Sequence, residues 1–181
     1  MSNRIQEPWL SFLHNVDRKL SQPIEVHCLG GFVLAVCSKL PRTTADVDFI
    51  EVRPGPAGEE LLRIAGEGTS LAARHSLYFQ RVTIAVYPED YETRLVDITP
   101  KSLHKLKLMA LEVHDVVLAK VSRNSARDRS DVEFLAKEGL IDPQVLKERF
   151  HAELRPYVLD ETRETLTLDL WLEEYFGNHR E

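Results

Sequence analysis

The sequence predicts an α/β (α+β) protein in which helices flank a mixed sheet and a helical C-terminal tail follows. Three observations indicate this fold class. Residues 24–52 have the pattern strand, glycine pair, apolar segment, strand; three short strand candidates lie between residues 78 and 111; and every later pattern is helical. The 181 residues suffice for one domain with a helical appendage. We therefore expect a domain over residues 1–140 and a helical extension over residues 141–181.

The N-terminal half of the chain alternates between helix and strand patterns. Residues 32–40 are apolar nearly all round, so periodicity alone does not separate helix from strand there. Their position after a glycine pair and before Pro41 favours a buried helix. The elements expected in this half are, in order, helix 7–20, strand 24–29, helix 32–40, strand 42–48, helix 59–65 and helix 70–74.

The C-terminal half begins with three strand candidates that follow one another closely. Strands joined by such short segments pair in antiparallel fashion, so we expect that arrangement for them. Gly139 and Gly177 are typical of helix C-termini, and Asp142 followed by Pro143 is typical of a helix start. The elements expected here are strands 78–86, 94–98 and 106–111, then helices 113–122, 128–137, 143–154 and 162–176.

Composition excludes some function classes. The net charge of −6 and the pI of about 5.7 argue against bulk binding to nucleic acid, although a local basic groove stays open. Cys28 and Cys37 fit no metal motif, so we expect buried free thiols in a reducing compartment. No apolar run approaches the length of a signal core or a membrane span, so we expect a cytoplasmic protein that does not bind membranes.

Two carboxylates carry the clearest chemical signal. If residues 42–48 are extended, Arg42, Thr44, Asp46 and Asp48 share one face of the strand, because successive side chains alternate. Two carboxylates at that spacing can bind one hard cation, and Mg²⁺ is the usual one in phosphate chemistry. The sequence therefore predicts a metal site at Asp46 and Asp48.

A glycine pair precedes the carboxylates. Gly30 and Gly31 leave backbone N–H groups open just before a helix N-terminus, and that geometry accepts phosphate. A phosphate-binding turn beside a carboxylate pair is what nucleotide transfer requires.

Three further polar residues interrupt apolar patterns. Lys120 lies within a stripe of valines and either extends past the core edge or points into a site. Asp131 lies on the apolar side of the next helix, where it serves the helix dipole, a site, or an ion pair with Lys120. Asp97, between apolar neighbours on a strand, is either a third active-site carboxylate, as general base or metal ligand, or an ordinary strand-end aspartate.

Together these residues resemble the polymerase-β-like nucleotidyltransferase superfamily. Its signature is a strand ending in Gly-Gly or Gly-Ser, then a helix, then a strand bearing Asp-x-Asp, and residues 30–48 match it. The run Arg-Thr-Thr-Ala-Asp at 42–46, the Lys-bearing segment 115–120 and the Arg-Asp-x-x-Asp of 127–131 resemble the branch of abortive-infection and toxin-type nucleotidyltransferases. The resemblance covers residues 26–140.

The resemblance implies a nucleotidyltransferase-like fold and a set of roles. The implied metal ligands, for Mg²⁺ or Mn²⁺, are Asp46, Asp48 and Asp97. The implied catalytic residues are Asp46, Asp48, Lys120 and Asp131. The implied nucleotide-binding residues are Gly30, Gly31, Arg42, Thr44 and Lys120.

The implied activity is metal-dependent transfer of a nucleoside monophosphate from an NTP to an acceptor. The acceptor stays open, with tRNA and protein among the options, and the toxin branch suggests a role in a toxin–antitoxin-like pair. The alternative is a weak or inactive nucleotidyltransferase-fold binding module that meets a partner protein through its C-terminal helices. Aspartate-based phosphatases and metal-dependent glycosyltransferases also use Asp-x-Asp, but neither accounts for the residues that precede it here.

Overall fold

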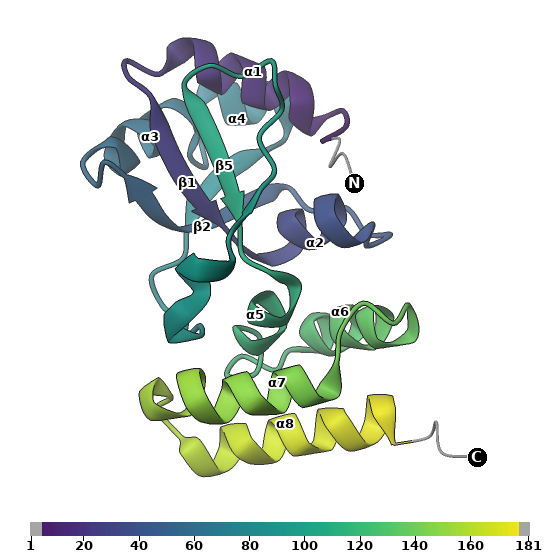
Figure 1. The fold of residues 1–181 in the computed structure, drawn as a ribbon. Helices are drawn as coiled ribbons and strands as arrows, with labels where there is room; N and C mark the ends of the chain where they lie inside the picture. Colours follow the sequence, from purple (N-terminus) through teal and green to yellow (C-terminus); the bar gives the residue numbers. More distant parts are fainter. Residues whose placement is uncertain (1–4, 178–181) are drawn as a thin grey trace. The chain divides into compact units, whose positions relative to one another are not determined.

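The structure is a computed structural model that describes residues 5–177 (Figure 1). It divides into two compact units. The first holds the chain up to Thr83 together with Leu95–Leu111, and the second holds Ile84–Arg94 and the chain from Glu112 onward.

The first unit is built on a five-stranded mixed sheet of order β3-β2-β1-β5-β4. The pairs β1–β2 and β4–β5 are antiparallel, and the pairs β1–β5 and β2–β3 are parallel. The strands are β1 (Ile24–Cys28), β2 (Asp46–Arg53), β3 (Tyr78–Arg81), β4 (Val96–Asp97) and β5 (Leu106–Ala110). The helices are α1 (Trp9–Lys19), α2 (Gly30–Ser38), α3 (Ala57–Ala65) and α4 (Ser70–His75). The mixed α/β fold class expected from the sequence is confirmed.

One face of this sheet is apolar and the other is polar. Val26 pairs with Leu108 of β5 on one side and with Val52 of β2 on the other, and all three are almost fully buried. Because directly paired residues point to the same face, this row forms the core face, which α1 and α3 cover through contacts with β5, β2 and β3. The opposite face carries the alternate residues of each strand.

The three later strands do not form one antiparallel group. β4 and β5 pair as expected, but β3 lies at the opposite edge of the sheet, parallel to β2. The reason is the connection: α3 and α4 lie between β2 and β3, and a crossover of that length brings a strand back parallel to the one before it.

The second unit is helical. In Figure 1, α7 and α8 lie side by side, and α5 contacts α7 while α6 contacts α8. Its helices are α5 (Val113–Leu118), α6 (Ala126–Lys137), α7 (Pro143–Arg149) and α8 (Glu161–Phe176), with a 3-10 helix η1 (Glu89–Arg94), a π-helical turn η2 (Phe150–Leu154) and a 3-10 turn η3 (Arg155–Tyr157). The expected helix 143–154 is therefore formed by α7 and η2 together.

The compact units do not follow the expected division at residue 140. The boundary falls after Leu111, because α5 contacts α7 and α6 contacts α8.

The two cysteines differ in burial. Neither forms a disulfide bond, and only Cys28 is buried, whereas Cys37 near the end of α2 is exposed, contrary to expectation. The first half of α2 is buried as expected, and its last turn reaches the surface. Among the described residues, no helix is long and apolar enough to cross a membrane.

Candidate active site

The carboxylate pair stands at the start of β2. Asp46 and Asp48 are half-buried and point away from the core, while Val47 and Phe49 between and after them are fully buried. Strand alternation explains this pattern. β2 begins at Asp46. Arg42 and Thr44 therefore lie in the loop before the strand, whereas the sequence analysis expected them on the strand itself.

Gly30 is fitted to the second of these carboxylates. Its φ is +78°, a left-handed conformation, and a Cβ at this position would lie 2.5 Å from Oδ2 of Asp48. The position therefore requires glycine twice, for its backbone conformation and for the close approach of the carboxylate. The backbone N–H of Leu29 donates to the carbonyl of Asp48 at 3.1 Å and holds the two segments together.

Arg42 and Thr44 complete the cluster from the loop before β2. A Cβ at Gly31 would lie 3.0 Å from the Arg42 guanidinium, so that group packs on the glycine. The Thr44 hydroxyl donates to Asp46 Oδ1. The six residues expected to bind metal and nucleotide in this part of the chain are thus brought together, although two of them lie in a loop: Gly30, Gly31, Arg42, Thr44, Asp46 and Asp48.

The cluster has the electrostatics of a site for a cation and a phosphate. The first-turn N–H groups of α2, which carry the positive end of the helix dipole, have no acidic residue in their own turn. Burial, followed by the charge of Asp48, raises the pKa of the Cys28 thiol, so this thiol stays neutral beside the carboxylates.

The donor set fits magnesium. Within residues 5–177 no group of three or more His, Cys, Asp or Glu side chains could hold a metal ion. Mg²⁺ is commonly held by one or two carboxylates, with water and substrate phosphate filling its remaining positions. Asp46 and Asp48 fit this donor pattern, and binding of the ion by them stays a prediction.

Asp97 does not join this pair. It pairs with Met109 on β5, and β5 and β1 both lie between its strand and β2. Three strand spacings of about 4.8 Å separate the strands by roughly 14 Å, too far for one shared ion with ligand bonds near 2.1 Å. The expectation of Asp97 as a ligand beside Asp46 and Asp48 is corrected, and Asp97 instead accepts from the backbone N–H of Thr99 at 2.9 Å.

Lys120 and Asp131 lie in the helical unit and contact each other. Lys120 Nζ donates to Asp131 Oδ2 at 3.0 Å and to Asp128 Oδ1 at 3.1 Å, and all three side chains are at most 4% exposed. Asp128 also forms a capping box with Ser125 at the N-terminus of α6. Burial raises the pKa of Asp128, but hydrogen bonds from Arg123 and Ser125 and the charge of Lys120 outweigh it and keep that pKa well below its usual range.

This network bears out one of the sequence alternatives, the direct ion pair between Lys120 and Asp131. It accounts for both residues without a substrate. Their roles at a nucleotide stay a prediction.

A family model described as "Nucleotidyltransferase of unknown function (DUF6036)" matches residues 12–180. The chain belongs to this family. The matched residues include both compact units, so the family model describes the helical unit as well as the sheet unit.

Two solved structures from Helicobacter pylori are similar to this family member at low identity. JHP933 is 15% identical, with 96% of this chain and 94% of that chain covered and a TM-score of 0.34. A candidate nucleotidyltransferase is 14% identical, with 98% and 100% covered and a TM-score of 0.34. No curated protein matches the chain.

In this DUF6036 protein, one residue beside the carboxylates was not indicated by the sequence. Tyr78 pairs with Asp46 across the parallel strands β2 and β3. Burial, then the charges of Asp46, Glu67 and Asp48, raises the pKa of its hydroxyl. Only the long crossover between the two strands could have suggested this parallel pairing.

Proposed function

We propose that this protein transfers a nucleoside monophosphate from an NTP to an acceptor, with Mg²⁺ or Mn²⁺ bound by Asp46 and Asp48. The observation that carries the proposal is the packing of the Asp48 carboxylate on Gly30 at the start of α2. It brings a hard-cation donor and a row of backbone N–H groups to one place, as a metal-bound triphosphate requires.

Each residue of the cluster has a distinct task in this proposal. Gly30 and Gly31 let Asp48 and Arg42 pack beside the first turn of α2, so that a phosphate bound to its backbone N–H groups lies next to both side chains. The Arg42 guanidinium, which packs on Gly31, neutralises phosphate charge. Thr44 orients Asp46 through its hydroxyl and leaves the second carboxylate oxygen for the cation.

The bound cation would neutralise charge that develops on the triphosphate during an in-line attack on the α-phosphate. The chain itself positions the reacting groups. Strand β2 fixes the spacing of the two carboxylates, and the glycine turn places the phosphate beside them. Asp97 has no part in this proposal, because its strand lies too far away.

The acceptor is proposed to be a macromolecule of the cell, tRNA or protein, whose modification would make the enzyme a toxin of a toxin–antitoxin-like pair. The resemblance to the toxin-type branch supports this finer statement. Expression of the wild type and of Asp46→Ala in a bacterial host tests it, since growth arrest is expected from the wild type alone.

A second function is favoured by one feature of the helical unit. On α8, Leu166 and Leu170 are 57% and 52% exposed and lie four residues apart, hence on one side of the helix. Such a stripe suits the alternative function, a weak or inactive nucleotidyltransferase-fold module that binds a partner protein.

The deciding experiment offers each of the four α-³²P NTPs, with Mg²⁺, to the total RNA and total protein of a cell extract. Label on RNA or protein identifies the acceptor class. Asp46→Ala is expected to abolish transfer, and Asp169→Ala, an exposed carboxylate on α8, is expected to keep it. Absence of transfer with every NTP, together with absence of metal-dependent NTP binding, would overturn the enzymatic proposal in favour of the binding module.

A further inference from the structure

A pocket of the helical unit lies between the segment that leads into η1 and the 3-10 turn η3. Ala85, Val86, Tyr87 and Glu89 line it from the first segment, and Tyr157 lines it from η3. All of these residues belong to the second compact unit. The pocket has a volume of about 360 Å³, which lies within the usual range for small-molecule sites.

Two tyrosine rings form part of this lining. Tyr87 packs edge to face with the buried Tyr91, with ring centroids 5.1 Å apart and an angle of 80° between the ring planes. In such a pair Tyr91 covers at most one face of the Tyr87 ring, so at least one face is not covered by Tyr91. Tyr157 is 51% exposed. The face of a tyrosine ring carries negative potential and attracts cations.

The charges beside these rings are negative as well. Hydrogen bonding with the Glu89 carboxylate, then burial and the charges of Glu89 and Asp90, raise the pKa of the Tyr157 hydroxyl. Neither lysine nor arginine is among the residues that line the pocket. The described part of the chain also places no lysine or arginine in an ion pair with Glu89. The carboxylate at this pocket therefore keeps a negative charge that no cation of the described residues neutralises.

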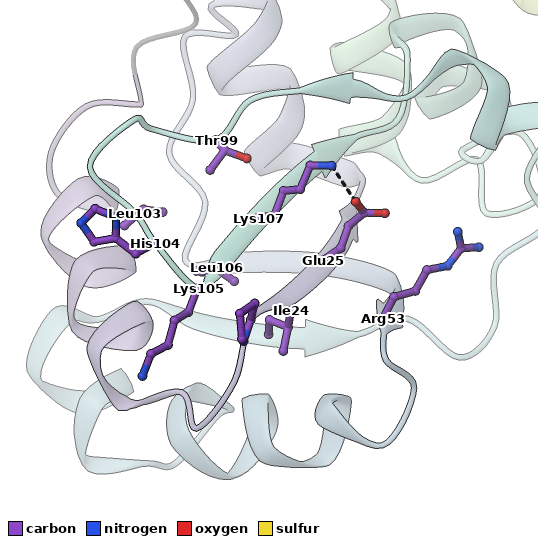
Figure 2. Close-up of a pocket in the computed structure, with 10 residues that line it drawn as sticks. Ile24, Glu25, Arg53, Thr99, Leu103, His104, Lys105, Leu106 and Lys107 are labelled. Atoms are coloured by element: carbon purple, nitrogen blue, oxygen red, sulfur yellow. Dashed lines mark hydrogen bonds and ion pairs between the residues drawn. The ribbon is translucent and has the colours of Figure 1, made fainter.

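A pocket of the sheet unit differs in this respect. Figure 2 shows Lys107 Nζ paired there with Glu25 Oε2, at 2.8 Å. Lys105, which also lines that pocket, donates from Nζ to the carbonyl of Leu20 at 2.6 Å. Because these charged groups already have partners within the protein, that pocket offers little to a charged ligand, whereas the pocket at Glu89 offers a carboxylate.

Glu153 of η2 holds the two walls of the Glu89 pocket together. Its carboxylate accepts the backbone N–H of Asp90 at 3.3 Å and pairs with Arg94 at 2.6 Å, so it contacts both ends of η1. Arg94 in turn pairs with the buried Asp115 at 3.0 Å. Since η2 leads directly into η3, these bonds also fix the turn that carries Tyr157. A preformed pocket lowers the ordering cost of binding.

We propose that this pocket is a binding site for a small organic ammonium cation, whose charged group lies against the Tyr87 and Tyr157 rings beside the Glu89 carboxylate. The apolar part of the ligand contacts Ala85 and Val86. The lining selects this class, because an anion is repelled by Glu89, an uncharged ligand leaves that charge uncompensated, and a hard metal ion finds a single carboxylate. The site does not depend on nucleotidyl transfer.

Phenethylammonium is a suitable probe, titrated at neutral pH into ¹⁵N-labelled full-length protein and followed by backbone amide shifts. The expected shifts are confined to residues 85–90 and 156–158. 2-Phenylethanol lacks the charge of the probe and methylammonium lacks its ring, so both are expected to bind more weakly. Shifts centred on residues 46–48, where the other carboxylates lie, or equal binding of 2-phenylethanol would overturn the proposal.

Substitutions separate the two attractions. Tyr157→Leu is expected to weaken phenethylammonium binding about two- to fivefold, the effect of losing one exposed cation–π contact, whereas Tyr157→Phe keeps the ring and the affinity. Glu89→Gln is expected to weaken binding by a similar factor of about two to five, the effect of losing one exposed ion pair. Glu138→Gln, at an exposed carboxylate outside the pocket, should leave binding unchanged.

Unchanged affinity in folded Tyr157→Leu and Glu89→Gln proteins contradicts the proposal. Both side chains are exposed, so neither substitution should prevent folding. Asp46→Ala is expected to bind the probe normally, so failure of the nucleotidyltransferase proposal would leave this one standing.

Discussion

The Asp48 carboxylate lies so close to Gly30 that a Cβ on the glycine would come within 2.5 Å of Oδ2. This relationship joins a residue of β2 to the first turn of α2 and determines the shape of the proposed site. It also means that adding a single methyl group at Gly30 should strongly affect Mg²⁺-dependent NTP binding.

Gly30→Ala is expected to abolish Mg²⁺-dependent NTP binding, because the added methyl group displaces the Asp48 carboxylate. Gly68→Ala is the matched control: Gly68 has a similar φ of +81°, yet nothing lies within 4 Å of the Cβ it would gain. Both variants should lose about 1–2 kcal/mol from the left-handed backbone alone. Isothermal titration with MgATP and denaturant unfolding separate the two effects, and wild-type binding by Gly30→Ala would refute the close-packing argument.

Asp46→Ala is expected to remove NTP binding without lowering the stability of the metal-free protein. Two carboxylates on one strand face repel each other when no cation lies between them, so loss of one relieves that repulsion. In the wild type, Mg²⁺ with an NTP at 100 times its Kd should add about 2.7 kcal/mol of stability. Thermal unfolding with and without each Mg·NTP measures both quantities. A large loss of Tm in the metal-free variant would mean that the pair is structural.

Lys120→Met is expected to destabilise the protein by roughly 3–5 kcal/mol, because it removes the buried cation that pairs with Asp131 and, together with Arg123, with Asp128. The double variant Lys120→Met with Asp131→Asn should recover part of this loss, since one buried charge is removed with its partner. Urea unfolding measures both variants. A Lys120→Met protein of wild-type stability with weakened triphosphate affinity would instead support the phosphate-binding role that the family resemblance implies.

Glu112 should make stability depend on pH in the acid range. Burial raises its pKa, but hydrogen bonds from His114 and Arg149 outweigh this and lower the pKa to about 2. The backbone N–H of Asp142 donates to Nε2 of His114, so Nδ1 carries the proton that is donated to Glu112. Because the folded pKa lies below the ordinary value near 4.3, this contribution is fully present above that value and is lost as pH falls toward 2.

The corresponding measurement is urea unfolding at pH values from 6 to 2.5 for the wild type and Glu112→Gln. The difference in unfolding free energy between the two proteins should shrink by roughly 2–3 kcal/mol across that range. A difference that stays constant with pH would show that Glu112 is not held as a charged group. Asp90→Asn, at an exposed carboxylate, serves as the control for the general effect of removing one acid.

Much of the candidate site was predictable because its signals are local. Asp46 and Asp48 share a face through strand alternation, and the glycine pair must precede a helix that starts with open N–H groups. Arg42 and Thr44 reach the same place from a loop and not from the strand that was expected for them, so the grouping was correct and its local geometry was not.

The errors arose where neighbours are chosen over long distances. Nothing in the pattern of residues 78–81 shows that this strand pairs with β2 at Tyr78, or that β4 lies three positions away from β2 with Asp97 on it. Lys120 shows a different limit. Its partners are only 8 and 11 residues away, but a lysine within an apolar stripe has the same sequence pattern whether it contacts a phosphate or two buried carboxylates.

The sequence by itself determined the mixed α/β class, most of the elements, and the carboxylate pair with its glycine turn, because each of these depends on spacing within a few residues. Only the tertiary structure decided the order of the strands, the exclusion of Asp97 from the pair and the ion pairs of Lys120. The strand order and the place of Asp97 depend on crossover paths, and the ion pairs of Lys120 depend on where the following helix places Asp128 and Asp131. In both cases the burial of apolar surface, not local propensity, selects the partner.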